Sequence, residues 1–174
     1  MAFDTYNEAD KCNELKCHNA IASNLKDFTI KYLNEDGESF GFDAMLYAPN
    51  GIEIPLEYEC SLHWYGDTYP SHWKYTKWFK NKADTKYRRF IQGNWKTGFY
   101  LKFNRNCTVF YIASFNKIVQ MQIETSKSYR NGNYFDVDSY YIMKEDMYLF
   151  RVEDINEVFK NMCNSEALEK LRIK

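Results

Sequence analysis

Hydrophobic residues recur along this chain with two spacings, one typical of helices and one typical of strands. Apolar positions three or four residues apart predict a helix over residues 5–33, a second over 76–92 and a third over 152–171. We expect an apolar stripe of the second helix to pack against the core and its opposite, basic face to meet solvent. The stripe consists of Phe79, Ala83, Tyr87, Phe90 and Ile91.

Strand-like segments lie between the predicted helices. Residues 39–47 and 52–62 are joined by a turn containing Asn50-Gly51, a strong signal for a hairpin. Because strand pairs alternate with helices, we expect one α/β domain over residues 1–174, a central mixed β-sheet flanked by helices. The further strands predicted are 98–104, 107–115, 118–123 and 134–143.

Composition fits such a domain and excludes several classes of protein. The 174 residues are 45% hydrophobic and 27% charged, which excludes a disordered, collagen-like or coiled-coil chain. The N-terminal segment has no basic stretch followed by an apolar one, and no apolar run is long enough to span a bilayer. We therefore expect a cytoplasmic protein that does not associate with membranes, and its five cysteines are expected to be reduced thiols.

The first hairpin brings acidic residues together. If its turn centres on Pro49 and Asn50, residues whose numbers add to about 100 face each other across the ladder. Asp43 then lies opposite Glu57 on one face, and Glu59 follows two residues further along. The pairs expected on the other, apolar face are Phe42 with Tyr58, Ala44 with Leu56, and Leu46 with Ile54.

Carboxylates placed opposite each other repel, by roughly 3 kcal/mol at about 5 Å and an effective dielectric constant near 20. A fold that keeps such a pair usually holds a cation there or raises a carboxyl pKa. Ligands that are all oxygen suit a hard ion such as Mg²⁺ or Mn²⁺. The alternative is that these acids lie on an ordinary solvated strand face.

The order of these residues resembles that of the PD-(D/E)XK, or restriction-endonuclease-like, nucleases. Asp43 and the element Glu57-Tyr58-Glu59 follow a predicted helix and precede a basic one. The resemblance implies a restriction-endonuclease-like sheet and hydrolysis of phosphodiester bonds, in DNA in preference to RNA. It also implies that Asp43 and Glu57 hold Mg²⁺ or Mn²⁺, which polarises the phosphate and lowers the pKa of the attacking water.

Two further roles follow from the same resemblance. Glu59 stands where the family usually has lysine, and it would orient the water or help to hold a second ion. Glu14, or alternatively Glu8, on the first helix is placed like an additional acid of the family and is a further candidate metal ligand.

A narrower resemblance runs from Asp43 to Ser114. The stretches PLEYECSLHWYGDTYPSHW, KYRRFI and TGFYLKFNRNCTVFYIAS, in that order, resemble small phage-type nuclease-like proteins. This resemblance implies action in the cytoplasm of a host cell. A nuclease of this size often dimerises to cut both strands, so a homodimer is a further expectation.

Positive charge is concentrated in one segment. Residues 73–105 contain ten lysines and arginines and one acid, a net charge of +9, whereas the whole chain carries −1. Ten aromatic residues interleave with these cations, and those rings that are exposed can stack on unpaired bases, whereas Phe79, Tyr87 and Phe90 are expected in the core. Cations that follow a helix face neutralise phosphates without reading base edges. The candidate nucleic-acid contacts are Lys77, Lys80, Lys82, Lys86, Arg88 and Arg89.

Two other functions stay open. Because Glu59 stands where the family usually has lysine, a chain that kept this fold and its basic surface could bind nucleic acid and lack catalysis. Alternatively, its aromatic surface could serve a phage interaction protein.

Cysteine and histidine give weaker signals. Cys12, Cys17 and His18 have no second ligand pair at zinc-finger spacing, so no zinc site is predicted there. Cys60 and Cys107 fall in predicted strands and are expected to be small buried thiols.

Overall fold

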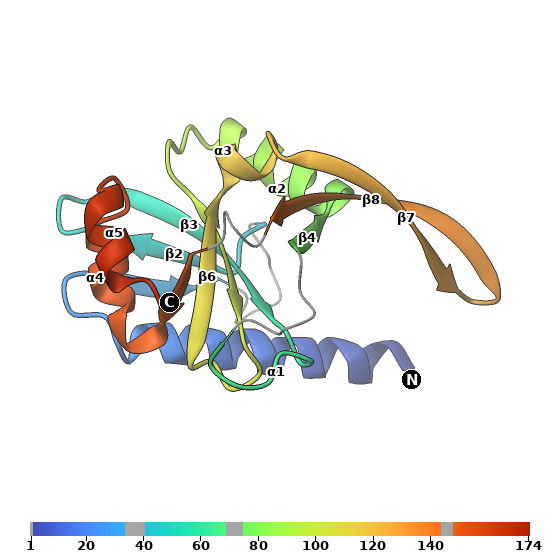
Figure 1. Ribbon diagram of the computed structural model, residues 1–174, viewed down its shortest axis with the longest axis horizontal. Coiled ribbons are helices and arrows are strands. Elements are labelled where there is room, and N and C mark those ends of the chain that lie inside the picture. Colours follow the sequence, from blue (N-terminus) through green and yellow to red (C-terminus); the bar gives the residue numbers. More distant parts are fainter. Residues whose placement is uncertain (1, 34–40, 69–74, 144–147) are drawn as a thin grey trace.

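The structure is a computed structural model that describes residues 2–33, 41–68, 75–143 and 148–174 (Figure 1). Within these ranges the strands form two sheets. The larger consists, in spatial order, of β1 (Thr29–Tyr32), β2 (Ala44–Tyr47), β3 (Glu53–Cys60), β5 (Phe99–Phe103), β6 (Val109–Ser114) and β9 (Leu149–Arg151). The smaller consists of β4 (Tyr75–Phe79), β8 (Asn133–Met143) and β7 (Gln122–Arg130). In the larger sheet β3 and β5 run parallel and the other neighbours antiparallel.

Helices cover both faces of the larger sheet. One face packs against α1 (Ala2–Ala22), α4 (Ile155–Lys160) and α5 (Ser165–Leu171), and the short 3₁₀ helix η2 (Val152–Asp154) leads into α4. The other face packs against α2 (Lys80–Gln92), α3 (Phe115–Ile118) and the smaller sheet. Figure 1 shows α1 on the opposite side of the sheet from α2 and α3. The predicted α/β class, a central mixed sheet flanked by helices, is confirmed.

Strand β5 is central in the sheet and buried along its whole length. Successive side chains of a strand point to opposite faces, so Leu101 and Phe103 enter the core beneath α1 while Tyr100 enters the core beneath α2. This double burial explains why the strand reads as an almost continuous apolar run. Lys102 is its one charged residue.

The first hairpin forms in the predicted register. Ala44 pairs with Leu56 and Leu46 with Ile54 across β2 and β3. Gly51 has φ +82°, a left-handed conformation that favours glycine, and its N–H donates to the carbonyl of Ala48 at 2.9 Å. The ladder ends at the Ala44 pair, because the residues before it have irregular backbone.

Phe42 does not join the apolar face on which it was predicted. It lies in the core beneath α2, where its ring stacks on Phe115 at 5.6 Å and meets Trp95 edge-on. The period-two rule fails here because Gly41, with φ +93°, turns the chain just before the ladder begins.

The boundaries of the predicted helices are wrong in three places. Residues 5–33 divide into α1 and β1, because Phe28, Ile30 and Tyr32 contact the core at every second position. The predicted third helix divides into η2, α4 and α5, and α5 is capped by Asn164, whose side chain accepts the Ala167 N–H at 3.1 Å.

The second predicted helix starts later than expected, since residues 75–79 form β4. Ala83 and Phe90 are buried as predicted, whereas Phe79 and Ile91 are exposed. The apolar stripe of α2 is therefore narrower than the sequence indicates.

Strands β7 and β8 form a long hairpin that projects from the body (Figure 1). Its turn is Asn131-Gly132, and both residues have positive φ, as hairpin turns of this length require. Near the end, the exposed rings of Tyr129 and Tyr134 lie 4.9 Å apart. No described helix is both long and apolar enough to cross a membrane.

Candidate active site

Asp43 and Glu57 are linked through the backbone of each other's strand. The N–H of Asp43 donates to Glu57 Oε2 at 3.2 Å, and the N–H of Tyr58 donates to Asp43 Oδ2 at 2.7 Å. These bonds continue the hairpin beyond the last ladder pair and hold both carboxyl groups at the same end of β2 and β3. The sequence-predicted neighbours are thus brought together, although they do not form a ladder pair.

Both acids are buried, each with a relative exposure of 5%. Burial is the main cause that raises the pKa of Asp43 to about 6, and the charge of Glu14 adds to it. Burial likewise raises the pKa of Glu57 to about 8, and the charge of Asp43 adds to it. A solvated strand face, the alternative drawn from the sequence, is therefore wrong for these two residues.

Lys86 of α2 supplies a positive charge to this pair. Its Nζ lies 2.6 Å from Glu57 Oε1 and also donates to the carbonyl oxygen of Gly41. Lys86 lowers the pKa of both acids, and Lys82, one turn earlier on α2, does the same more weakly. The contact between Lys86 and Glu57 is an ion pair when the carboxyl group is ionised and a hydrogen bond when it is protonated.

Glu59 is differently placed. Its Oε1 lies 3.0 Å from Nζ of Lys102, which is the residue facing it on the parallel strand β5. The side chain of Glu59 is 45% exposed, whereas that of Lys102 is 11% exposed. The two acids of the Glu-x-Glu element therefore have separate lysine partners, one from a helix and one from a strand.

Glu14 approaches the pair from α1. Its Oε2 accepts the hydroxyl of Tyr32 at 3.2 Å, and its charge acts on Asp43. In the described part of the chain, however, Glu14 does not complete a set of three ligand atoms within 4.8 Å of one another with Asp43 and Glu57. The side chain of Glu8, the alternative, lies outside the described residues.

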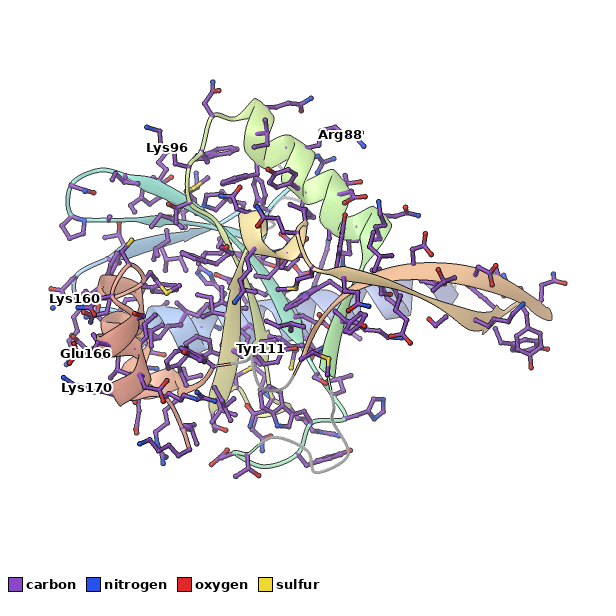
Figure 2. The ribbon with its side chains drawn as sticks, turned by 45° about the horizontal axis from the view of Figure 1, so that its top comes forward. Arg88, Lys96, Tyr111, Lys160, Glu166 and Lys170 are labelled. Atoms are coloured by element: carbon purple, nitrogen blue, oxygen red, sulfur yellow. The ribbon has the colours of Figure 1, made fainter. Side chains whose placement is uncertain are left out.

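The predicted phosphate contacts divide into paired and exposed cations. Lys86 pairs with Glu57, and Lys80 pairs with Asp84 and lies 5.6 Å from the ring centre of Tyr140. Figure 2 shows Arg88 at the outer surface of α2. The exposed members are Lys77 on β4 and Lys82, Arg88 and Arg89 on α2.

Lys82, Lys86 and Arg89 share one face of α2, and this face adjoins the acid pair. Lys86 contacts Glu57 directly, and the side chain of Arg89 stands against Gly41, which is close enough that a Cβ there would meet it at 2.3 Å. The basic row predicted from helical spacing thus begins at the carboxylates and continues to the surface.

Most aromatic rings of the basic segment belong to the core. Of those described, Trp78, Phe90, Phe99, Tyr100 and Phe103 are buried, whereas Phe79 is 57% exposed. Phe90 is buried as expected, whereas Phe79 is not, and the buried rings are not available to stack on bases. Trp73, a further ring of this segment, lies outside the described residues.

Sequence reasoning missed the roles of two lysines. Lys86 was expected to contact phosphate and instead pairs with a carboxyl group, and Lys102 was not singled out. The pairing of Lys102 with Glu59 depends on the parallel register of β3 and β5, which separates the two residues by a whole helix in the chain. For Lys86, the signal available in the sequence was its helical spacing with Lys82 and Arg89.

A surface hollow of about 310 Å³ lies between α4 and α5. Its lining, which includes Glu157, Asn164 and Lys170, contains none of the predicted site residues. The candidate site is therefore identified by its charged groups and their burial, and not by this hollow.

Comparisons of the chain with models of protein families, with curated proteins and with solved structures find no match. Function is therefore inferred from the residues and their geometry.

Proposed function

We propose that the protein is a metal-dependent nuclease that hydrolyses phosphodiester bonds, in DNA in preference to RNA. One observation carries the proposal: two linked, buried carboxyl groups with raised pKa values adjoin a row of cations on α2. Buried acids whose pKa values are shifted by their surroundings are typical of functional sites. The order of α1, an acid-bearing hairpin and a basic helix supports the finer assignment to the restriction-endonuclease-like class.

The donor set of this site fits a hard divalent cation. Asp43 and Glu57 offer carboxylate oxygens, the ligands that Mg²⁺ and Mn²⁺ prefer. Bound there, the ion would polarise the phosphate and make a water molecule more acidic. Glu14 of α1, whose carboxylate accepts the hydroxyl of Tyr32 from β1, is placed to approach as a further acid.

The Glu-x-Glu element lacks the lysine that is usual in the family, and other lysines supply the positive charge. A positive group near the attacking water would stabilise the charge that develops as the water loses its proton. Lys86 reaches the acid pair from α2, whereas the charge of Glu59 is balanced by Lys102. We therefore assign the cationic role to Lys86 and leave Glu59 as the candidate group that orients the water.

The surface of α2 supplies phosphate binding. Lys82, Arg88 and Arg89 are exposed on this helix, and Lys82 and Arg89 lie on the face that adjoins the carboxyl groups. Contacts of this kind hold the nucleic-acid backbone in place and carry no base sequence. We expect cleavage with little sequence preference and a binding affinity that falls steeply with salt.

The test measures strand breakage directly. Supercoiled plasmid, single-stranded DNA and RNA are each incubated with the protein in Mg²⁺, Mn²⁺ or chelator. Cleavage should require the metal and should fall at least about 100-fold in Asp43→Asn and Glu57→Gln, since each change removes a proposed ligand. Asp136→Asn is the matched control, because Asp136 is an exposed acid of the β7–β8 hairpin. Unchanged cleavage in Asp43→Asn would remove the assigned site.

Binding without hydrolysis is the second candidate, and one observation favours it. Each acid already has a partner within the protein, since Glu57 contacts Lys86 and Asp43 accepts the Tyr58 N–H. An internal pair of this kind could be kept for structure alone. Salt-dependent retention of DNA without turnover in either metal would select this candidate.

A further inference from the structure

Three cysteine sulfurs from separate segments meet beside the sheet. Cys17 lies in α1, Cys60 at the end of β3, and Cys107 in the turn between β5 and β6. Their Sγ atoms all lie within 4.8 Å of one another, and those of Cys17 and Cys107 are 3.7 Å apart. Cys107 is a buried thiol, as the sequence predicted, whereas Cys60 is only half-buried.

We propose that Cys17, Cys60 and Cys107 form a three-thiolate site for a zinc ion. Zinc–sulfur bonds of about 2.3 Å at tetrahedral angles place ligand sulfurs about 3.8 Å apart. The separation of Cys17 and Cys107, 3.7 Å, matches this spacing. For three atoms no more than 4.8 Å apart, some point lies within about 2.8 Å of all three, so each sulfur needs to move by no more than about 0.5 Å.

Secondary structure and backbone hydrogen bonds fix the positions of the three cysteines. Cys107 has φ +54°, an uncommon conformation for a residue with a side chain, and its N–H donates to the carbonyl of Asn104 at 3.0 Å. The buried side chain of Asn104 closes the turn by accepting the N–H groups of Thr108 at 2.8 Å and Val109 at 3.2 Å. The other two cysteines lie on a helix and a strand, which position ligands more rigidly than loops do.

Charge and exposure also fit a thiolate-bound ion. Three thiolates and Zn²⁺ carry a net charge of −1, and the positive charges of Lys16 and Arg105 both act on Cys60. Lys16 also donates to the carbonyl of Arg105 at 2.7 Å, an oxygen 3.8 Å from Cys60 Sγ. Cys60 is only half-buried, whereas Cys17 and Cys107 are buried. A water molecule can therefore reach the ion from the side of Cys60 and complete four ligands.

This site is distinct from the acid pair. Cys17 and Cys107 belong to the core beneath α1, whereas Glu57 faces α2. A zinc ion there would tie α1, β3 and the β5–β6 turn together and would stabilise the folded chain by mass action. Soft thiolate ligands do not suit Mg²⁺, so the two metals would not compete.

The test uses Co²⁺ as a spectroscopic probe and Zn²⁺ as the competitor. The reduced, chelator-treated full chain is titrated with Co²⁺, and the absorption from thiolate-to-cobalt charge transfer is recorded. We expect one Co²⁺ per chain, displaced by one Zn²⁺, and an affinity at least about 100-fold lower in Cys60→Ser, because that change removes a direct ligand. The double variant Cys12→Ser/Cys163→Ser is the matched control, since both residues are exposed, and it should keep the spectrum.

Two further measurements keep the outcome clear. Urea unfolding of Cys60→Ser without metal establishes that it folds, and Zn²⁺ should raise the unfolding midpoint of the unmodified chain but not that of this variant. Asp43→Asn should keep the cobalt spectrum, which separates this site from the proposed nuclease site. The proposal is overturned if charge-transfer absorption is missing at stoichiometric Co²⁺, or if it persists in Cys60→Ser.

Discussion

Replacing Glu57 by glutamine should change how the stability of the protein depends on pH. The carboxyl group of Glu57 has its pKa raised from 4.5 to about 8 by burial and by Asp43. Between these values the unfolded chain has lost this proton and the folded chain keeps it. The free energy of unfolding gained from Glu57 is therefore fully present below pH 4.5 and is lost as pH rises through 8.

The size of the effect follows from the same values. One pKa unit corresponds to about 1.4 kcal/mol, so the free energy of unfolding should fall by about 2 kcal/mol between pH 6 and pH 8 on account of Glu57 alone. Asp43 contributes mainly below this range, because its pKa is raised only to about 6. Glutamine does not titrate, so Glu57→Gln should lack this loss.

Urea unfolding in the presence of chelator, followed at several pH values from 6 to 8, measures the difference. A change of about 2 kcal/mol moves the urea midpoint by about 1 M for a protein of this size. Comparing the two proteins at each pH cancels the other titrating groups. Glu59→Gln is the control, because Glu59 is exposed, and it should keep the slope of the unmodified chain. Parallel curves for Glu57→Gln and the unmodified chain would refute the reasoning.

Four further outcomes are expected. Lys86→Met should lower the free energy of unfolding by about 3–5 kcal/mol above pH 8, where Glu57 is ionised, and by less at pH 6. Adding Glu57→Gln should restore most of the lost stability. An equal loss at both pH values would contradict the pairing of Lys86 with Glu57. Lys82→Ala/Arg89→Ala should reduce the slope of log affinity against log salt for duplex DNA by about 2, measured by fluorescence anisotropy, whereas Lys127→Ala/Lys170→Ala, exposed on β7 and α5, should leave it unchanged. Asn104→Ala should cost about 3 kcal/mol in urea unfolding, because it removes the buried Asn104 side chain that accepts the N–H groups of Thr108 and Val109. A loss below about 1 kcal/mol would show that the turn does not depend on it. Leu101→Ala should cost about 2–5 kcal/mol in the same assay, because Leu101 is fully buried at the centre of the sheet, whereas the exposed Leu62→Ala should cost little.

The hairpin was predictable because local chemistry determines it. Asn50-Gly51 sets the position of the turn, and period-two alternation then sets the register, so the meeting of Asp43 and Glu57 followed from the sequence. The basic face of α2 was predictable for the same reason, since helical spacing alone aligns Lys82, Lys86 and Arg89. What these cations would face was not predictable from spacing.

The features that the sequence did not predict depend on contacts between distant segments. The pairing of Glu59 with Lys102 needs the parallel register of β3 and β5, and the meeting of Cys17 and Cys107 needs α1 to cross the β5–β6 turn. The end of α1 was misplaced because residues 29–32 suit a helix by apolar spacing but gain more from pairing with β2. Tertiary pairing overrides local preference in such segments.

The β7–β8 hairpin divides the molecule into regions of unequal protection. Residues 139–143 of β8 pair with β4 as well, whereas residues 125–138 pair only within the hairpin, and their side chains are mostly exposed. Amide protons should therefore exchange with deuterium rapidly near Asn131-Gly132 and progressively more slowly toward Tyr140. The same gradient makes this turn a suitable place to insert an affinity tag or a fluorescent label without disturbing either core.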